Sequence, residues 1–419
     1  MHLGPHNLHS LSSAMRVLFV QFSNSMFPRF AVSDGYWDAF YSTYEDFGYM
    51  RMDDAFEVPK WIAEVCFFLP RNCEQKICWV HHSIDEAIGE IEKGNYDFVL
   101  FSVMTCTKIF TDNIIKNSSP LQQFVIGGYD NWIFEAERRY ENVHTAKSMK
   151  ETAQMMGIPY SFGTDYSLFE EWTVLPRLTL SYGCMNNCKF CIVPHEMSTV
   201  PKNVIEQQVD SFQDLYFRLI YIDDKTFGQA ENYRIIGELG ERIRRYNPQF
   251  NGFVIQTTTG LLSKRAIEFR NLGVVVAEVG AETFNDRILR AYRKPSSEKM
   301  ILKSIEAAKK AEIMIIPNLI VGFPEETESS YRRTYGFLED YAPKLFGINF
   351  AMYTDYSSQE CIGEVDFAPS AKINLHRKYW KILNDLATCK VIDQRKAPIR
   401  SCNSERFLIS YRTERQISA

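Results

Sequence analysis

Short apolar runs alternate with amphipathic segments through the middle of the chain. The apolar runs lie at Arg177–Ser181, Arg218–Ile222, Gly252–Thr257, Gly273–Val279, Ile313–Val321 and Leu345–Met352. Each run is rich in β-branched residues, and a helical pattern separates it from the next. Because repeated strand–helix units require parallel strands, the pattern predicts the six strands of a partial (β/α)6 barrel.

The N-terminal third shows a second series of strand-like and helical patterns. Strand-like runs lie at Arg16–Phe22, Lys76–Val80, Asp97–Val103 and Phe124–Gly128. Helical patterns lie between them at Trp61–Phe68 and Ile84–Ile91. This alternation predicts a separate doubly wound, Rossmann-like parallel sheet, so the fold class is α/β.

These patterns divide the chain into five segments. We expect a flexible N-terminus at 1–14, the doubly wound domain at 15–150, a linker at 151–175, the partial barrel at 176–355, and a C-terminal extension at 356–419. In the extension, Leu375, Tyr379, Leu383 and Leu386 recur at helical spacing, which predicts a helix over 371–387 before a basic tail.

Composition indicates a globular protein outside the membrane. Charged residues make up 24% and hydrophobic residues 45% of the chain, and no apolar run approaches the length of a spanning helix. The net charge of -5 gives no electrostatic case for nucleic acid as the main partner. Ten cysteines in 419 residues, and a start without the features of a secretory signal, predict reduced thiols and a cytoplasmic location.

Three cysteines follow the first barrel strand in a single short loop. Cys184, Cys188 and Cys191 form a C-x-x-x-C-x-x-C triplet. Three thiolates at this spacing can hold a metal, and a 4Fe–4S cluster held by only three cysteines leaves one iron open to another ligand. In a barrel of this class the loops that follow strands carry function, so the triplet lies at the expected position of a site.

Zinc is the main alternative for this loop. His195 would complete a tetrahedral Cys3His set, as in a zinc-binding interaction protein that is not an enzyme. Structural zinc sites usually draw their ligands from two separated knuckles, which argues against this interpretation. Cys361, Cys389 and Cys402 raise the idea of an auxiliary cluster, although their spacing is long and irregular.

The triplet, the strand–helix units and the run Asn318–Thr327 together resemble the radical S-adenosylmethionine (SAM) superfamily. The resemblance implies that SAM chelates the open iron of a 4Fe–4S cluster. It also implies an electron donor such as flavodoxin or ferredoxin, cleavage of SAM to methionine and a 5'-deoxyadenosyl radical, and a small-molecule or peptide substrate.

The resemblance further implies which residues contact SAM. Phe190 corresponds to an aromatic near the adenine, although a plain core aromatic would look the same. Asp223 and Asp224 end the second strand, where the methionyl amine is received; a helix N-cap before Lys225 is the alternative. Glu278 and Glu282 correspond to the residues that hold the ribose; the alternative for one of them is a solvated loop carboxylate.

The Gly322-Phe-Pro turn resembles the turn that follows the family's fifth strand, with Ile320 and Val321 beside the adenine. Asn318 departs from a glycine often found there. Tyr353 and Tyr356 lie in a loop unlike the proline-rich turn of many relatives, so they are candidate substrate contacts. For Arg293 and Lys294 there are two interpretations: contact with the SAM carboxylate, or the favoured one, a solvated helix end.

A doubly wound domain before a radical SAM barrel is similar to the cobalamin-binding domain of one branch of the family. Ser102-Val-Met104 resembles its serine turn, and Gly127-Gly128 its paired glycines. The D-x-H-x-x-G sequence of that domain is missing, and His81-His82 lacks its aspartate and glycine, so the resemblance assigns no axial histidine.

Three reactions follow as hypotheses. The first is cobalamin-dependent methyl transfer to an unactivated carbon. The second is another radical reaction beside a degenerate cobalamin domain. The third is methylthio transfer, which would need a second cluster on N-terminal cysteines, whereas Cys66, Cys73, Cys78 and Cys106 look like scattered or buried thiols.

Overall fold

A computed structural model describes residues 14–22, 58–104, 107–128, 141–170, 174–341, 345, 347–353 and 371–394, without the side chains of 387–394. The chain forms two compact units, which divide near Leu168. Tyr356, Cys106, Cys361 and Cys402, and the side chain of Cys389, lie outside the described residues, so the predictions on them stay predictions.

The first unit is built on a five-stranded parallel sheet in the order β2-β1-β3-β4-β5. Its strands are β1 (Arg16–Phe22), β2 (Glu74–Val80), β3 (Phe98–Ser102), β4 (Gln123–Gly127) and β5 (Val143–Thr145). The strand order reverses between β1 and β3, which is the switch point of a doubly wound sheet. The predicted fold class of this unit is therefore confirmed.

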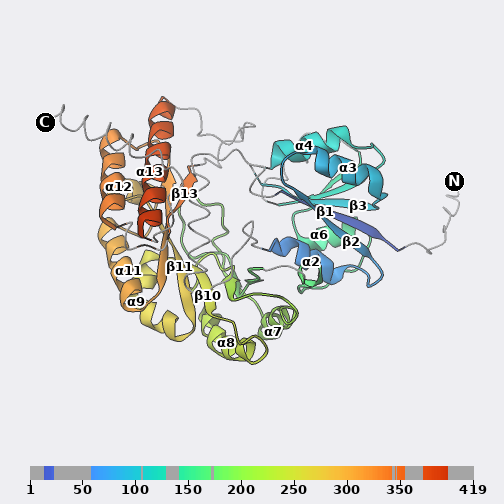
Figure 1. The fold of residues 1–419 in the computed structure, drawn as a ribbon, viewed down its shortest axis with the longest axis horizontal. Helices are drawn as coiled ribbons and strands as arrows, with labels where there is room; N and C mark the ends of the chain where they lie inside the picture. Colours follow the sequence, from blue (N-terminus) through green and yellow to red (C-terminus); the bar gives the residue numbers. More distant parts are fainter. Residues whose placement is uncertain are drawn as a thin grey trace. The chain divides into compact units, whose positions relative to one another are not determined.

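Helices cover both faces of this sheet. They are α2 (Lys60–Phe68), α3 (Asp85–Gly94), α4 (Lys108–Asn117) and α6 (Met149–Met155). Figure 1 shows α3 and α4 on one face and α2 and α6 on the other. On the α3 and α4 face, strand residues such as Leu18, Val20 and Phe101 pack with Ile91 and Ile114 as one apolar core. The near-continuous apolar strands thus reflect a sheet buried on both sides.

The first unit extends further along the chain than we expected. It continues to Leu168, and α6 and the residues after it pack with α2. Asp165 N donates to Ala63 O at 2.9 Å, and the Tyr160 ring lies 5.7 Å from the Phe68 ring. Much of the segment 151–175, predicted as a linker, is therefore part of this unit.

The second unit contains six parallel strands that curl into a half-barrel, in the order β13-β12-β11-β10-β9-β6. They are β6 (Arg177–Leu178), β9 (Leu219–Ile222), β10 (Gly252–Thr258), β11 (Val274–Glu282), β12 (Met314–Val321) and β13 (Asn349–Met352). The six predicted strands are confirmed, with one correction. The expected strand Arg177–Ser181 ends at Leu178, and β7 (Ser181–Tyr182) turns away to pair antiparallel with β8 (Ser198–Thr199).

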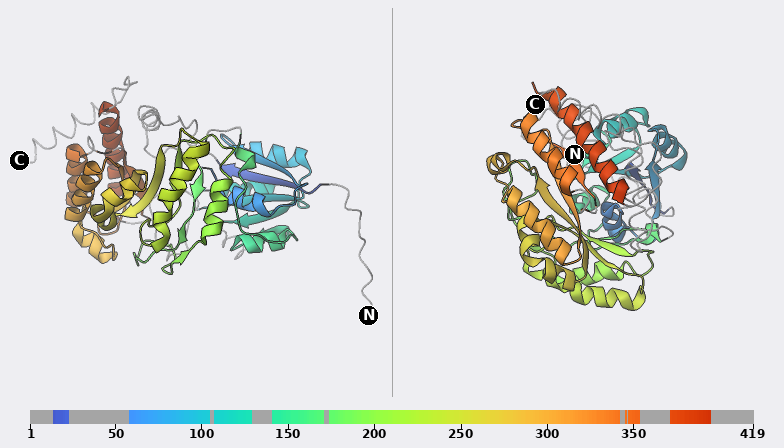
Figure 2. Two further views of the ribbon diagram at one scale, coloured as in Figure 1. Left: turned by 90° about the horizontal axis from the view of Figure 1, so that it is seen from below. Right: turned by 60° about the vertical axis from the view of Figure 1, so that its left-hand side comes forward.

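Helices line one face of this curved sheet (Figures 1 and 2). They are α7 (Lys202–Asp210), α8 (Ile235–Tyr246), α9 (Thr259–Asn271), α11 (Glu298–Lys310) and α12 (Glu328–Tyr341); the short helix α10 (Asp286–Ala291) lies between β11 and α11 along the chain. Side-chain caps fix the starts of several: Thr258, Asn285 and Ser297 accept from backbone N–H groups of α9, α10 and α11. Because all six strands are parallel, their carboxyl ends, and so the mouth of the half-barrel, lie at one edge.

The predicted C-terminal helix is α13 (Ile373–Gln394), which lies beside α12 (Figure 1). Its apolar residues Tyr379, Leu383 and Leu386 are buried, as the helical spacing predicts. Among the described residues, no helix is long and apolar enough to cross a membrane.

Candidate functional site

The cysteine loop is closed at its base by the β7 and β8 ribbon. Ser181 pairs with Thr199, and Cys184 N donates to Pro194 O at 2.9 Å. Gly183 has a φ of +80°, and a Cβ there would lie 2.0 Å from Glu196 O. Only glycine fits this close approach of the two loop ends. The three cysteines are therefore held on one tight loop at the carboxyl edge of the half-barrel.

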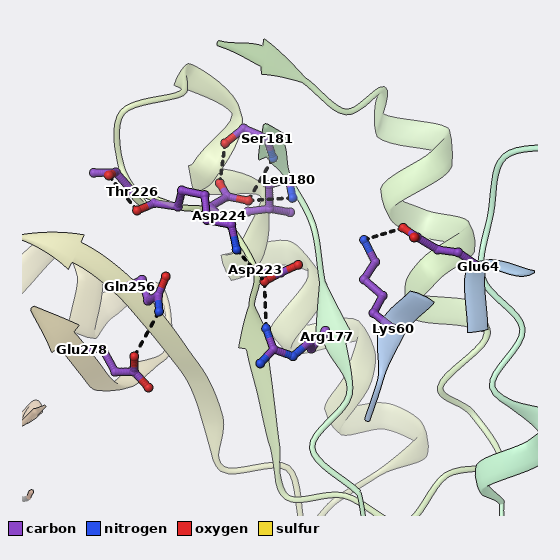
Figure 3. A network of polar contacts seen from close by, with 11 residues as sticks. Lys60, Glu64, Arg177, Leu180, Ser181, Asp223, Asp224, Thr226, Gln256 and Glu278 are labelled. Atoms are coloured by element: carbon purple, nitrogen blue, oxygen red, sulfur yellow. Dashed lines mark hydrogen bonds and ion pairs between the residues drawn. The ribbon is translucent and has the colours of Figure 1, made fainter. Parts of the chain in front are cut away.

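Asp224 anchors the start of this loop. Its Oδ1 accepts from Leu180 N and Ser181 N at 2.9 Å each, and its Oδ2 accepts from Ser181 Oγ at 2.7 Å (Figure 3). The side chain is buried, and desolvation raises the pKa of its carboxyl although these donors oppose the shift. These bonds explain why β6 stops early: the backbone at Leu180 and Ser181 turns toward Asp224 instead of continuing the sheet.

Asp223 faces a different set of partners. It pairs with Arg177 Nη1 at 2.8 Å (Figure 3). The Arg177 guanidinium lies 4.6 Å from the centre of the Tyr221 ring. Lys225 Nζ is 3.5 Å from the same carboxylate oxygen. The predicted contact of these aspartates with the methionyl amine stays a prediction, and the structure shows that Asp224 also holds the loop.

The donor set of the loop fits a cluster better than a single zinc ion. Cys184 and Cys188 are buried and Cys191 is exposed. Within the described ranges, no three His, Cys, Asp or Glu side chains converge on one point that could hold a metal ion. Each cysteine of a 4Fe–4S cluster binds its own iron, so such convergence is not needed. His195, the proposed fourth zinc ligand, places Nδ1 2.9 Å from Asn186 O within the loop.

Burial and charge act in opposite directions on the thiols. Burial raises the pKa of Cys188 to about 11, while the nearby Lys294 ammonium lowers it. Burial also raises the pKa of Cys191. Thiolate, not thiol, binds metal, so loading iron must displace these protons.

Lys294 is a buried partner of Glu282, and the favoured expectation of a solvated helix end is wrong for it. Its Nζ lies 2.6 Å from Glu282 Oε1, and the two side chains are 9% and 10% exposed. Burial alone would lower the pKa of Lys294, but the Glu282 carboxylate outweighs it and raises the pKa. The charge pattern of the sequence does not predict this burial, because a lysine that follows a helix usually lies at the surface.

Glu282 itself has a left-handed backbone, with a φ of +62°. It follows a register irregularity between Gly280 and Glu282 in the pairing of β11 with β12. A non-glycine residue in this region of φ is uncommon and persists where the surroundings hold it. At this irregularity the Glu282 side chain points toward Lys294, near the cysteine loop.

An aromatic cluster joins the cysteine loop to the ends of α10, β12 and β13. The Phe190 ring lies 6.2 Å from the Tyr292 ring and 5.9 Å from the Phe323 ring, and the Tyr353 ring lies 5.1 Å from that of Phe323. Ile320 packs in the same cluster. Lys294 Nζ is 6.0 Å from the Phe190 ring centre. The structure thus brings the predicted residues Phe190, Ile320 and Tyr353 together.

The concave face of the sheet carries two hydrogen-bonded pairs of polar side chains. Gln256 Nε2 donates to Glu278 Oε2 at 3.1 Å (Figure 3), and Asn349 Nδ2 donates to Asn318 Oδ1 at 3.0 Å. These four residues are partly exposed, whereas their neighbours along β10 to β12 are mostly buried. Below them, apolar residues such as Tyr221, Val254 and Ile316 pack together. The half-barrel is therefore filled at one end and accessible at the mouth.

The edge of the first unit is built from small residues. Ser102 pairs directly with Gly127, and Val103 N donates to Gly127 O at 2.8 Å. Gly128 has a φ of +97°, and a Cβ there would lie 2.2 Å from Val103 O. The structure thus brings the predicted serine turn and the paired glycines together.

The histidine pair after β2 has a structural role. The backbone N–H groups of His81 and His82 donate to Glu86 at 2.8 and 3.1 Å, just before α3. This arrangement fixes the turn into the helix.

Several site-adjacent residues were missed from the sequence. Gly322 N donates to Tyr331 Oη at 3.1 Å, and Tyr331 Oη lies 2.7 Å from His376 Nδ1. Glu326 is 2% exposed and accepts from Thr283 Oγ1 at 3.1 Å. No motif or spacing in the sequence links residues so far apart. The one signal was the helical spacing of apolar residues in α13, which predicts a helix with one buried face.

A loop with three cysteines at the mouth of a parallel half-barrel defines an iron–sulfur enzyme domain of the partial-barrel class. Residues 178–338 match the Radical SAM superfamily, and the chain therefore carries a radical SAM domain. This confirms the predicted superfamily. The domain implies a 4Fe–4S cluster and SAM as cofactors, and the cysteine loop has the soft thiolate donors that such a cluster needs.

Two solved structures share this fold across both units at low identity. The cobalamin-dependent SAM radical enzyme OxsB, with aqua-cobalamin and SAM bound, is 12% identical with a TM-score of 0.52, over 91% of this chain and 56% of that one. The chain thus spans little more than half of OxsB. The radical SAM methyltransferase TsrM from Kitasatospora setae, with cobalamin and a [4Fe-4S] cluster bound, is 12% identical with a TM-score of 0.53, over 85% and 80%.

Curated relatives by sequence are methylthiotransferases. The tRNA-2-methylthio-N(6)-dimethylallyladenosine synthase of Campylobacter curvus is 21% identical over 79% of this chain and 79% of that protein. The ribosomal protein uS12 methylthiotransferase RimO of Clostridium botulinum is 22% identical over 81% and 79%. The solved structure of TsrM is thus named a methyltransferase, whereas these sequence relatives are named for methylthio transfer.

Proposed function

We propose that this radical SAM enzyme is a cobalamin-dependent methyltransferase that acts on an unactivated carbon of a small molecule or peptide. When bound, the cluster and SAM would supply an electron and a 5'-deoxyadenosyl radical, and cobalamin would supply a methyl group. The proposal includes a cytoplasmic location and an electron donor such as flavodoxin or ferredoxin.

One observation carries the cobalamin part of the proposal: the direct pairing of Ser102 with Gly127 at the carboxyl edge of a doubly wound sheet. Ligands of such sheets bind outside this edge, at the switch point of strand order, which lies here between β1 and β3, and Ser102 ends β3. Serine and glycine leave backbone exposed and take little room, so a long ligand tail can approach closely. The edge needs no histidine for this contact.

In the half-barrel, the residues have separate tasks. Cys184, Cys188 and Cys191 would hold the cluster, and Lys294 places a positive charge near Cys188 and Cys191. Phe190, Ile320 and the Gly322 turn would pack against SAM, and the carboxylates of Asp223, Glu278 and Glu282 would orient its polar groups. The partly exposed amides of Gln256, Asn318 and Asn349 and the Tyr353 ring would orient the substrate.

Cobalamin retention tests this proposal. The anaerobically purified chain is incubated with hydroxocobalamin, desalted, and read by visible absorption and by iron content. We expect about one cobalamin per chain, and a chain that keeps none while it still cleaves SAM would contradict the proposal in favour of a degenerate domain.

Two substitutions of Gly127 test the location of the cobalamin site. A Cβ at Gly127 would lie 3.9 Å from its nearest neighbours and Gly127 has no positive φ, so Gly127→Ala should fold and keep cobalamin. Gly127→Leu adds bulk where the tail would run. We expect it to lose cobalamin with SAM cleavage unchanged; equal retention by both variants would argue against this edge as the site.

Methylthio transfer is the second candidate, because curated methylthiotransferases align over about four fifths of the chain. It would predict a second cluster in the N-terminal unit, with iron near eight per chain rather than four. Of the cysteines described there, Cys66 and Cys78 are buried with raised pKa values, mainly because of desolvation. Mass spectrometry of the product separates an added methyl from an added methylthio group.

A further inference from the structure

The C-terminal helix α13 is attached to the turn that follows β12. Lys372, just before the helix, donates from Nζ to Pro324 O at 2.7 Å and to Glu326 O at 2.9 Å. Both carbonyls belong to the Gly322-Phe-Pro-Glu-Glu-Thr turn. α13 lies outside residues 178–338, the part of the chain that matches the Radical SAM superfamily. A segment outside the matched domain therefore holds one of its turns.

A buried chain of hydrogen bonds reaches further into the same turn. Gly322 N–H donates to Tyr331 Oη at 3.1 Å, and Tyr331 Oη lies 2.7 Å from His376 Nδ1. Tyr331 Oη accepts from Gly322 N–H, and when His376 Nδ1 carries no proton the tyrosine donates its own proton to that nitrogen. Tyr331 and His376 are each 2% exposed, so water is a poor substitute for either partner.

The other side of the turn is tied to β11. The buried Glu326 carboxylate accepts from Thr283 Oγ1 at 3.1 Å and from Ser330 Oγ. Thr283 directly follows Glu282, the partner of Lys294. The turn is thus fixed from two sides, and Gly322, with a φ of +108°, has its peptide orientation set by the contact with Tyr331.

We propose that Tyr331 and His376 are positioning residues for SAM, which orient the Gly322 peptide through a hydrogen-bond chain anchored on α13. The inference rests on the proposed contact of the Gly322 turn with SAM. Removal of the tyrosine hydroxyl leaves the buried Gly322 N–H without its acceptor, and the peptide must turn or take in water to recover a bond. The cluster ligands lie on another loop, so cluster loading should not change.

A matched pair of hydroxyl deletions tests the inference. Tyr331 and Tyr379 are both buried and their rings stack 4.6 Å apart, but Tyr379 donates to Glu328, the first residue of α12, and not to the Gly322 peptide or His376. Tyr331→Phe and Tyr379→Phe therefore remove the same atom from the same stack. The readouts on cluster-loaded full-length protein are iron content, SAM affinity by calorimetry, and the change that SAM causes in the EPR spectrum of the reduced cluster.

We expect both variants to keep wild-type iron content. Tyr331→Phe should bind SAM about tenfold more weakly and alter the EPR response to SAM, while Tyr379→Phe stays within about twofold of wild type. Equal SAM affinity in the two variants would overturn the inference. A wild-type chain that loads its cluster but binds no SAM would overturn the proposed function instead, and this inference with it.

Histidine variants provide a second route should Tyr331→Phe fold poorly. His376→Asn keeps an acceptor near the position of Nδ1, and His376→Leu removes it. The inference predicts near-normal SAM affinity for the first and about tenfold weaker binding for the second. Similar affinities for both would show that α13 acts only through packing and would overturn the positioning role.

Discussion

The two parallel sheets of this chain build their carboxyl edges from opposite kinds of residue. In the first unit the edge consists of Ser102, Gly127 and Gly128, and the loops touch through their backbones. In the half-barrel the edge carries three thiols, an aromatic cluster and the buried pair of Glu282 and Lys294. The same strand pattern thus supports one edge that leaves space and another that is full of reactive and charged side chains.

This difference indicates which kind of substitution should damage each edge. A backbone edge tolerates changes of chemistry but not of volume, because its function is to let another surface approach. The function of an edge built from side chains depends on individual groups. When one charged or ligating side chain is removed, its partner stays buried without a contact. The predictions below test this contrast from the largest expected effect to the smallest.

Loss of one cysteine should abolish the chemistry of the half-barrel. Cys188→Ala should remove the cluster and reduce 5'-deoxyadenosine formation to background, because three thiolates are the minimum set on this loop. Cys73→Ala, in the first unit, is the control and should retain both iron and SAM cleavage. Iron analysis and chromatography of the products measure this. A Cys188→Ala chain that still forms 5'-deoxyadenosine would refute the assignment.

Breaking the buried ion pair should cost the most stability. Lys294→Met leaves Glu282 buried without its cation, which should lower the free energy of unfolding by about 3–5 kcal/mol. Lys202→Met, in the exposed pair of Lys202 with Glu238, should cost less than about 1 kcal/mol. Urea denaturation of both variants measures the difference. Equal small losses would show that the Glu282–Lys294 pair is not closed in solution.

In the first unit, a Cβ that collides with the backbone should destabilise the fold more than a Cβ that only strains its own φ angle. Gly128 and Gly157 both have positive φ, but only at Gly128 would a Cβ collide with a backbone atom, Val103 O. Gly128→Ala should cost about 3 kcal/mol and Gly157→Ala about 1 kcal/mol. Thermal unfolding of the two variants separates volume from strain; a larger loss for Gly157→Ala would contradict the close approach.

The smallest effect concerns the turn into α3 and depends on pH. Burial opposes ionisation of Glu86, but backbone N–H groups of His81 and His82 outweigh it and lower the pKa of its carboxyl below 4.5. A carboxyl with a lowered folded pKa stabilises the protein above its unfolded pKa and loses this effect as the pH falls through the folded value. Glu86→Gln should therefore cost about 1 kcal/mol at neutral pH and nothing in strong acid. A loss independent of pH would exclude the charge as its cause.

The sequence predicted the repeating elements well, because they depend on local periodicity. β1 has the predicted bounds, Arg16–Phe22, and the other core strands differ from prediction by a few residues at their ends. The predicted strand Arg177–Ser181 ends three residues early, because Asp224, more than forty residues later, accepts hydrogen bonds from the backbone N–H groups of Leu180 and Ser181. No local propensity records such a long-range bond.

The candidate site was predictable where it depends on a motif and not where it depends on tertiary contacts. The cysteine triplet, Phe190 and the Gly322 turn are visible as short motifs. Lys294 looked solvated because charged residues usually are, and its burial follows from the turn after α10 that brings it to Glu282. The link from Gly322 through Tyr331 to His376 joins three separate elements, so only the folded chain shows it.

The central claim is that the loop of Cys184, Cys188 and Cys191 holds a 4Fe–4S cluster that cleaves SAM. Its most direct test is an anaerobic reconstitution in which iron, sulfide and 5'-deoxyadenosine are measured on the same sample after addition of SAM and dithionite. The account predicts iron and sulfide near four per chain, with 5'-deoxyadenosine formed only when SAM and reductant are both present. A chain that binds about one zinc, or that loads iron and sulfide but forms no 5'-deoxyadenosine, would contradict it.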